Sequence, residues 1–135
     1  MDTQQRYDRG LELLRRMLGP DQAEQTRQVW RAICPDFEAY VLEFLAGEIW
    51  QRPGLDLRTK SLTTIATLMG MGRWRGLELN IRMALNNGAS RQDVIETLLH
   101  NAPYAGFPAC WEGLVLADKV FREQDADTRR PPGGG

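Results

Sequence analysis

Apolar residues recur every three or four positions along nearly the whole chain, and this helical period most constrains the fold. Near the N-terminus, Tyr7, Leu11, Leu14 and Leu18 follow the spacing, which places them on one face of a helix. The same period returns in each later segment, and no stretch alternates apolar and polar residues as a half-buried strand would. We therefore predict an all-α fold of about six or seven helices.

Pro, Gly and small polar residues mark where the predicted helices begin and end. Gly19-Pro20 ends the first helix, and Pro35 suits the first turn of a later one. Asp21, Asp56 and Ser90 are predicted N-caps. The helix that starts at Pro35 carries a wide apolar face, which we expect to pack in the core, formed by Phe37, Tyr40, Val41, Phe44, Leu45 and Ile49.

The length of 135 residues is that of one ordinary domain. We predict one helical domain over residues 1–124 and a disordered polar tail over residues 125–135, which ends in PPGGG. No apolar stretch approaches the roughly 18 residues of a membrane span, and the polar N-terminus has no signal region, so a cytoplasmic protein is expected. A net charge of -1 without a basic run argues against nucleic-acid binding.

The two cysteines, Cys34 and Cys110, form neither a CxxC motif nor a zinc-binding spacing. We expect two reduced, partly buried thiols. Because the chain has a single histidine, no dedicated metal site is expected.

Charged and aromatic residues concentrate in GEIWQRPGLDLRTKSL, residues 47–62, around a Pro-Gly break. Glu48 follows Phe44 and Leu45 by four and three positions, so its carboxylate is predicted to lie near the apolar face and to be desolvated. Desolvation favours the neutral form of a carboxyl group and suits it to proton transfer near neutral pH. The alternative for Glu48 is a structural salt bridge with Arg52 or Arg58.

Arg52 and Arg58 flank the break, and a guanidinium matches the geometry of a carboxylate. Either could hold an acid or stabilise developing enolate-like charge, and the alternative is a solvated or helix-capping arginine. Trp50 is a candidate pocket wall, with the core or a subunit interface as the alternative.

Three candidates lie further along the chain. His100 is the single imidazole and is predicted on the face opposite the Val94–Leu98–Ala102 stripe, together with Tyr104. That face would be exposed in a monomer and could meet a partner in an oligomer. Asn80 is predicted on the inward side of its helix, where it could orient a substrate or make a helix-to-helix contact.

Four motifs, in this order, carry a family resemblance: EIWQRPGL, ATLMGMGR, IRMALNNGAS and LLHNAPYAGFPA. Over roughly residues 7–123 the chain resembles the carboxymuconolactone decarboxylase family. The resemblance implies the all-α alkylhydroperoxidase D-like fold, decarboxylation without a cofactor, and trimers or hexamers. It implies catalytic roles for Glu48 and His100, and substrate binding by Arg58, Asn80, Trp50, Tyr104 and Arg52.

The chain departs from the family at several positions. The peroxidase-like branch has two cysteines and a histidine where this chain has Lys60, Thr63 and Thr67, so a thiol peroxidase is not expected. Asn80 replaces the histidine usual in the decarboxylase branch, and Ala105 replaces a frequent cysteine.

The sequence therefore predicts a cofactor-free lyase that acts on a small cyclic or aromatic-derived carboxylic acid by acid/base chemistry. Because of Asn80, two alternatives stay open. One is a related isomerase or cyclase of a specialised biosynthetic pathway, and the other is a non-catalytic ligand-binding member.

Overall fold

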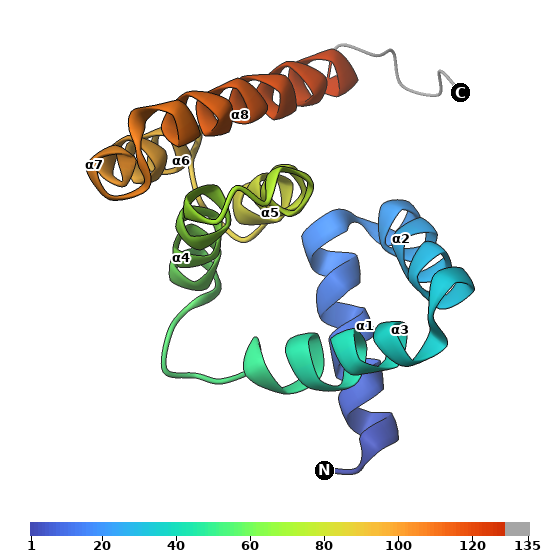
Figure 1. The fold of residues 1–135 in the computed structure, drawn as a ribbon. Helices are drawn as coiled ribbons and strands as arrows, with labels where there is room; N and C mark the ends of the chain where they lie inside the picture. Colours follow the sequence, from blue (N-terminus) through green and yellow to red (C-terminus); the bar gives the residue numbers. More distant parts are fainter. Residues whose placement is uncertain (129–135) are drawn as a thin grey trace. The chain divides into compact units, whose positions relative to one another are not determined.

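A computed structural model describes residues 1–128 and confirms the all-α class (Figure 1). Helix α3 continues directly into the π-helical segment η1, so the two form one continuous helix, and α7 has only 4 residues. The described residues therefore contain seven long helices, in agreement with the predicted six or seven. The elements are α1 Thr3–Leu18, α2 Pro20–Ile33, α3 Pro35–Tyr40, η1 Val41–Ile49, α4 Leu57–Gly70, α5 Trp74–Asn86, α6 Arg91–His100, α7 Ala102–Ala105 and α8 Phe107–Thr128.

The chain divides into two compact units. Unit 1 is Met1–Lys60, which contains α1, α2, α3 and η1. Unit 2 begins at Ser61 and contains most of α4 and the helices α5 to α8. Among the described residues, no helix has the length and apolar character needed to cross a membrane.

Two glycines bring the backbones of α1 and η1 into direct contact in unit 1. A Cβ atom on Gly10 would overlap the Leu42 carbonyl group, and one on Gly47 would lie 2.6 Å from the Leu42 carbonyl oxygen and overlap the Arg6 carbonyl. No side chain fits at either position without a shift of backbone. The absence of a side chain therefore sets how closely η1 lies against α1.

The apolar face predicted for the helix from Pro35 is exposed in the chain, which corrects that expectation. Phe37, Tyr40, Phe44, Leu45 and Ile49 are all exposed. The contact face of α3 and η1 consists instead of Glu38, Leu42, Ala46 and Gly47. The reason is steric, because Ala46 and Gly47 allow the close approach of η1 to α1, whereas large apolar side chains at these positions would hold the helices apart.

A polar cluster joins α1, α2 and α3. Glu38 is only 5% exposed, and its Oε1 accepts hydrogen bonds from the Tyr7 hydroxyl at 2.5 Å and from Arg27 Nη1 at 3.3 Å. Arg27 also donates to both carboxylate oxygens of Glu24, at 2.9 and 2.5 Å. Burial, followed by the bond to Glu38, raises the pKa of Tyr7. The cluster thus satisfies a buried carboxylate, as a folded interior requires.

Unit 2 has an apolar core built from α4 to α8. The N-cap predicted at Ser90 is confirmed, since Ser90 Oγ accepts from the Asp93 amide. Asp93 Oδ2 accepts in return from the Ser90 amide, so the two residues form a capping box. Buried Asn87 donates from Nδ2 to Ser61 Oγ at 3.0 Å, which ties the end of α5 to α4. The core cluster contains Ile65, Met69, Leu77, Ile81, Ala84, Ala89, Val94, Leu98, Ala102, Cys110, Ala117 and Val120.

Of the N-caps predicted at Asp56 and Asp21, one is present and one is not. Asp56 caps α4 as expected, since its Oδ1 accepts from the Thr59 amide at 2.7 Å. Asp21 is not an N-cap, because α2 already begins at Pro20 and Asp21 lies in its first turn. The fixed φ of proline favours the first helical position, so the helix starts one residue earlier.

The first four residues of the predicted tail, 125–128, are helical. Helix α8 continues through Thr128, and Asp125 accepts from Arg91 Nη2 at 2.7 Å. Residues 129–135, which make up the rest of the predicted tail, lie outside the described part of the chain.

Candidate functional site

A pocket of about 330 Å³ lies along the contact between α1 and η1 in unit 1. Helix α1 contributes two arginines. Helix η1 and the turn after it contribute a glycine, a carboxylate, an amide and a further arginine. The lining residues are Met1, Arg6, Arg9, Gly47, Glu48, Gln51 and Arg52.

The local geometry explains why these residues meet. Gly47 brings η1 onto the backbone of α1 at Arg6, so the residue that follows, Glu48, faces the same hollow as the α1 arginines. Arg6 and Arg9 are three positions apart and therefore neighbours on one helix face. The pocket wall carries three guanidinium groups and one carboxylate, so it attracts an acid.

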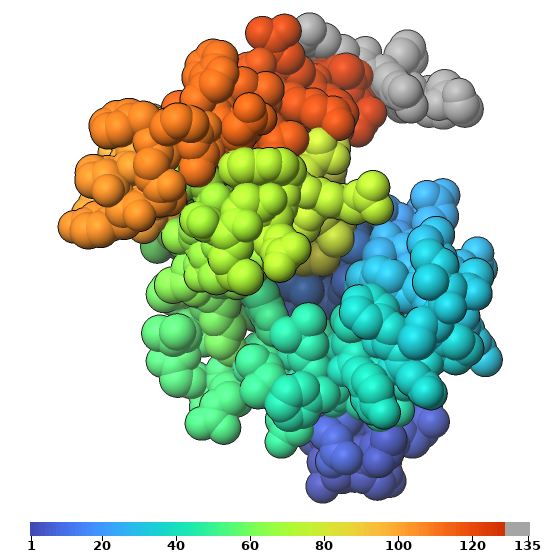
Figure 2. Space-filling model, viewed as in Figure 1, coloured from blue at the N-terminus to red at the C-terminus, as the bar shows by residue number. Residues whose placement is uncertain are grey.

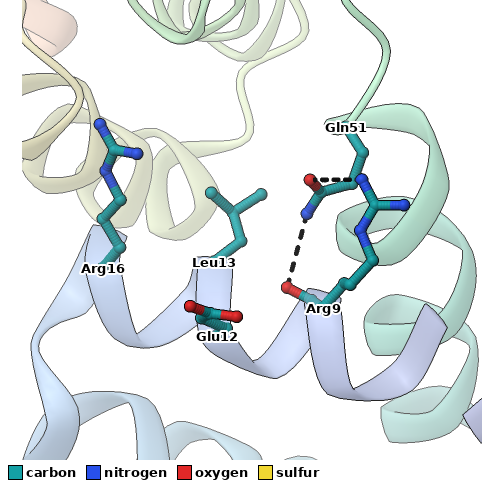
Figure 3. Close-up of a pocket in the computed structure, with 5 residues that line it drawn as sticks. All are labelled: Arg9, Glu12, Leu13, Arg16 and Gln51. Carbon is teal, nitrogen blue, oxygen red and sulfur yellow. Dashed lines mark hydrogen bonds between the residues drawn. The ribbon is translucent and has the colours of Figure 1, made fainter. Parts of the chain in front are cut away.

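A second hollow of about 310 Å³ adjoins the first and is lined by Arg9, Glu12, Leu13, Arg16 and Gln51. Arg9 and Gln51 line both hollows. Figure 3 shows the Gln51 side chain reaching across to α1, where two hydrogen bonds join it to Arg9.

Gln51 holds Arg9 through a reciprocal pair of bonds. Arg9 Nη2 donates to Gln51 Oε1 at 3.2 Å, and Gln51 Nε2 donates to the carbonyl oxygens of Arg9 at 3.4 Å and Ala46 at 3.0 Å. Gln51 is thus hydrogen-bonded to both helices, and its Oε1 holds the guanidinium of Arg9 in position.

Lys60 fixes the turn that follows η1. Its Nζ donates to the carbonyl oxygens of Trp50 at 2.9 Å and Arg52 at 2.5 Å. These carbonyls lie at the C-terminal end of a helix, where a cation is favoured. Lys60, where the family resemblance would place the first cysteine of the peroxidase-like branch, here stabilises the backbone beside Glu48.

The structure brings together some of the site residues predicted in unit 1. Glu48 and Arg52 line the same pocket, whereas Trp50 and Arg58 are not among its lining residues. Trp50 is half-buried at the end of η1, and Arg58 is exposed in the first turn of α4. Glu48 is exposed in the chain, so the expectation of a desolvated carboxylate is wrong for the isolated chain. Glu48 is exposed because it lies on the same face of η1 as Phe44 and Leu45, which are exposed themselves.

The other predicted site residues belong to unit 2. His100 is exposed at the end of α6, as predicted, and its ring centroid lies 6.0 Å from that of Tyr104. Asn80 is half-buried in α5, and its Nδ2 donates to the Gly76 carbonyl oxygen at 2.8 Å. This bond stays within the helix, so it is not the predicted helix-to-helix contact.

Sequence reasoning missed Arg6, Arg9 and Gln51. The two arginines precede the motif that drew attention, and their contact with it depends on the glycine crossing. Their spacing on one face of α1 was a signal that could have been used.

The two cysteines differ in exposure. Cys110 is buried, whereas Cys34 is exposed. The expectation of a partly buried thiol is therefore wrong for Cys34. Thr67 Oγ1 donates to the Thr63 carbonyl oxygen, so these two peroxidase positions serve the helix itself. Within residues 1–128, no three His, Cys, Asp or Glu side chains gather closely enough to hold a metal ion.

The chain is a helical protein whose pocket holds three arginines beside one carboxylate, and comparison identifies its family. Residues 35–119 match the model of the carboxymuconolactone decarboxylase family. The chain belongs to this family. Helix α1, with Arg6 and Arg9, lies before the matched residues.

Three curated relatives are similar to the chain. The 4-carboxymuconolactone decarboxylase of Acinetobacter baylyi is 36% identical over 91% of this chain and 92% of its own length. The nitrosuccinic acid decarboxylase npaB of Metarhizium robertsii is 31% identical over 87% of this chain and 82% of its own. An uncharacterized 15.0 kDa protein of Paracoccus denitrificans, from the nqo9-nqo10 intergenic region, is 32% identical over 70% and 72%.

Proposed function

We propose that the protein is a decarboxylase that acts on a small carboxylic acid without a cofactor. The observation that carries the proposal is the placement of Glu48 beside Arg6, Arg9 and Arg52 in one pocket. The names of the two decarboxylase relatives support the same reaction class.

The chemistry assigns different tasks to these groups. When the bond to the leaving carboxylate breaks, carbon dioxide departs and the bonding electrons remain on the substrate as an enolate-like anion. A guanidinium such as that of Arg52 stabilises this charge. The Glu48 carboxyl group then delivers a proton to the carbon, and solvent returns the proton to Glu48. We retain His100 as an assisting group and Arg58, Asn80, Trp50 and Tyr104 as substrate-binding candidates.

Carbon dioxide release from 4-carboxymuconolactone and from nitrosuccinic acid tests this function. We expect the wild type to release carbon dioxide from one of these acids or from a related one. If it is silent on both while Asn80→His gains activity, the fold is a decarboxylase whose proton transfer at residue 80 was lost. Silence from both proteins on both acids would contradict these substrates.

A non-catalytic ligand-binding member is the second candidate, and Asn80 is the observation that favours it. An amide cannot exchange protons as a histidine does, and its Nδ2 is already bonded to the backbone of its own helix. This candidate predicts that acids bind in the pocket and that none is turned over.

We also propose that the protein forms a homo-oligomer, a trimer or hexamer. We further propose that it is cytoplasmic and acts in aromatic degradation. Large apolar side chains are exposed in each unit, including Ile33 at 80% and Phe44 at 56% in unit 1, and Phe107 at 68% and Trp111 at 65% in unit 2. The surface formed by α2, α3 and η1 is continuous, from light blue to teal in Figure 2. Monomers rarely expose so much apolar surface. Sedimentation velocity should give a mass of three or more chains, and a monomer of 15.4 kDa would contradict the proposal.

A further inference from the structure

Arg9 is the one residue of α1 that lines both hollows, and its side chain also donates a hydrogen bond to Gln51 in the turn after η1. The proposed decarboxylation uses Arg52 to stabilise the enolate-like charge and Glu48 to deliver the proton. Arg9 lines the same pocket, but neither the charge stabilisation nor the proton transfer uses it.

The partners of Arg9 leave part of its donor capacity poorly used. Its Nη1 donates to the Met1 sulfur at 3.2 Å, and a thioether is a weak acceptor. A carboxylate is a much stronger acceptor for a guanidinium, so a ligand that enters the pocket can replace this contact. By contrast, Arg6 Nη1 donates to the Met1 carbonyl oxygen at 2.6 Å and its Nη2 to Thr3 Oγ1 at 3.3 Å.

The anchoring of Gln51 makes this recognition directional. Because Gln51 is bonded to α1 and η1, Arg9 loses little further freedom when it binds a ligand. The charges agree, since three guanidinium groups face a single carboxylate and their excess suits a ligand with two negative charges.

We propose that Arg9, oriented by Gln51, is a specificity-determining residue that binds a second carboxylate of the substrate, one that the reaction does not remove. This inference rests on the proposed function, because it takes the bound acid to be the substrate of the decarboxylation. It predicts that the pocket selects dicarboxylic acids over monocarboxylic acids of the same chain length.

Titration calorimetry with succinate and butyrate tests the inference without turnover. These acids have the same number of carbons and differ in the second carboxylate. The wild type should bind succinate at least about tenfold more tightly than butyrate. Arg9→Met should weaken succinate binding about tenfold or more and change butyrate binding less than about twofold. Arg9→Lys, which keeps the charge without the fork, should restore only part of the preference.

Two further variants separate position from charge. Gln51→Glu places a carboxylate against Arg9, where it competes with the ligand, so the preference for succinate should fall as in Arg9→Met. Arg15→Met is the matched control, since Arg15 is an exposed α1 arginine that lines neither hollow. It should leave both affinities within about twofold of the wild type. Circular dichroism confirms that each variant is folded.

A wild type that binds succinate no more tightly than butyrate overturns the inference, as does an equal loss for both acids in Arg9→Met. These results are independent of the carbon dioxide assay. Turnover with an Arg9-independent preference would leave the proposed function standing and remove the role of Arg9. A preference for succinate that depends on Arg9, without turnover, would support the role of Arg9 and contradict the proposed function.

Discussion

Gly10→Ala is expected to abolish the observed packing of α1 on η1 and to destabilise unit 1 by more than about 3 kcal/mol. The added Cβ would overlap the Leu42 carbonyl group and lie 3.1 Å from the Gly47 nitrogen. Both obstacles are backbone atoms, which cannot move aside as the end of a flexible side chain can. The helices would have to separate, and the pocket between them would be lost.

Thermal unfolding followed by circular dichroism measures this effect, with Gly54→Ala as the control. A Cβ on Gly54 meets no atom within 4 Å. That substitution should be neutral or stabilise the protein by up to about 1 kcal/mol, because alanine restricts the unfolded chain. If Gly10→Ala unfolded at the wild-type temperature, the glycine contact would not determine how α1 and η1 pack.

The glycine contact also explains which part of the fold could be predicted. Helix ends at Pro35, Asp56 and Ser90 follow from chemistry within a few residues, and they agree with the structure. The buried face of η1 does not follow from hydrophobicity, because Ala46 and Gly47 are buried while Phe44 is exposed. That choice depends on backbone contact with a helix more than thirty positions earlier, which no local pattern contains.

The candidate site divides in the same way. Glu48 and Arg52 belong to one short motif, and the structure places them in one pocket. Arg9 and Gln51 are 42 positions apart, and their bond exists only after α1 and η1 have packed. Residues contributed by a second helix could therefore not be predicted from the motif.

Glu48→Gln is expected to lower kcat for carbon dioxide release by a factor of about 10² to 10⁴, the usual contribution of a positioned acid or base. Glutamine keeps the size of the side chain but cannot deliver a proton. The substitution also removes a negative charge from the pocket that we propose binds the acid, so KM should stay the same or fall. A fall in kcat without a rise in KM would distinguish proton transfer from substrate binding.

Steady-state carbon dioxide release by the wild type, Glu48→Gln and Glu43→Gln provides the measurement. Glu43 lies on the same helix but does not line the pocket, so its variant controls for the loss of a carboxylate from η1 and should keep kcat within about twofold. Equal kcat values for wild type and Glu48→Gln would exclude Glu48 as the proton donor. If the wild type has no turnover, tighter succinate binding by Glu48→Gln would still place this carboxylate beside the bound acid, since like charges at close range oppose binding.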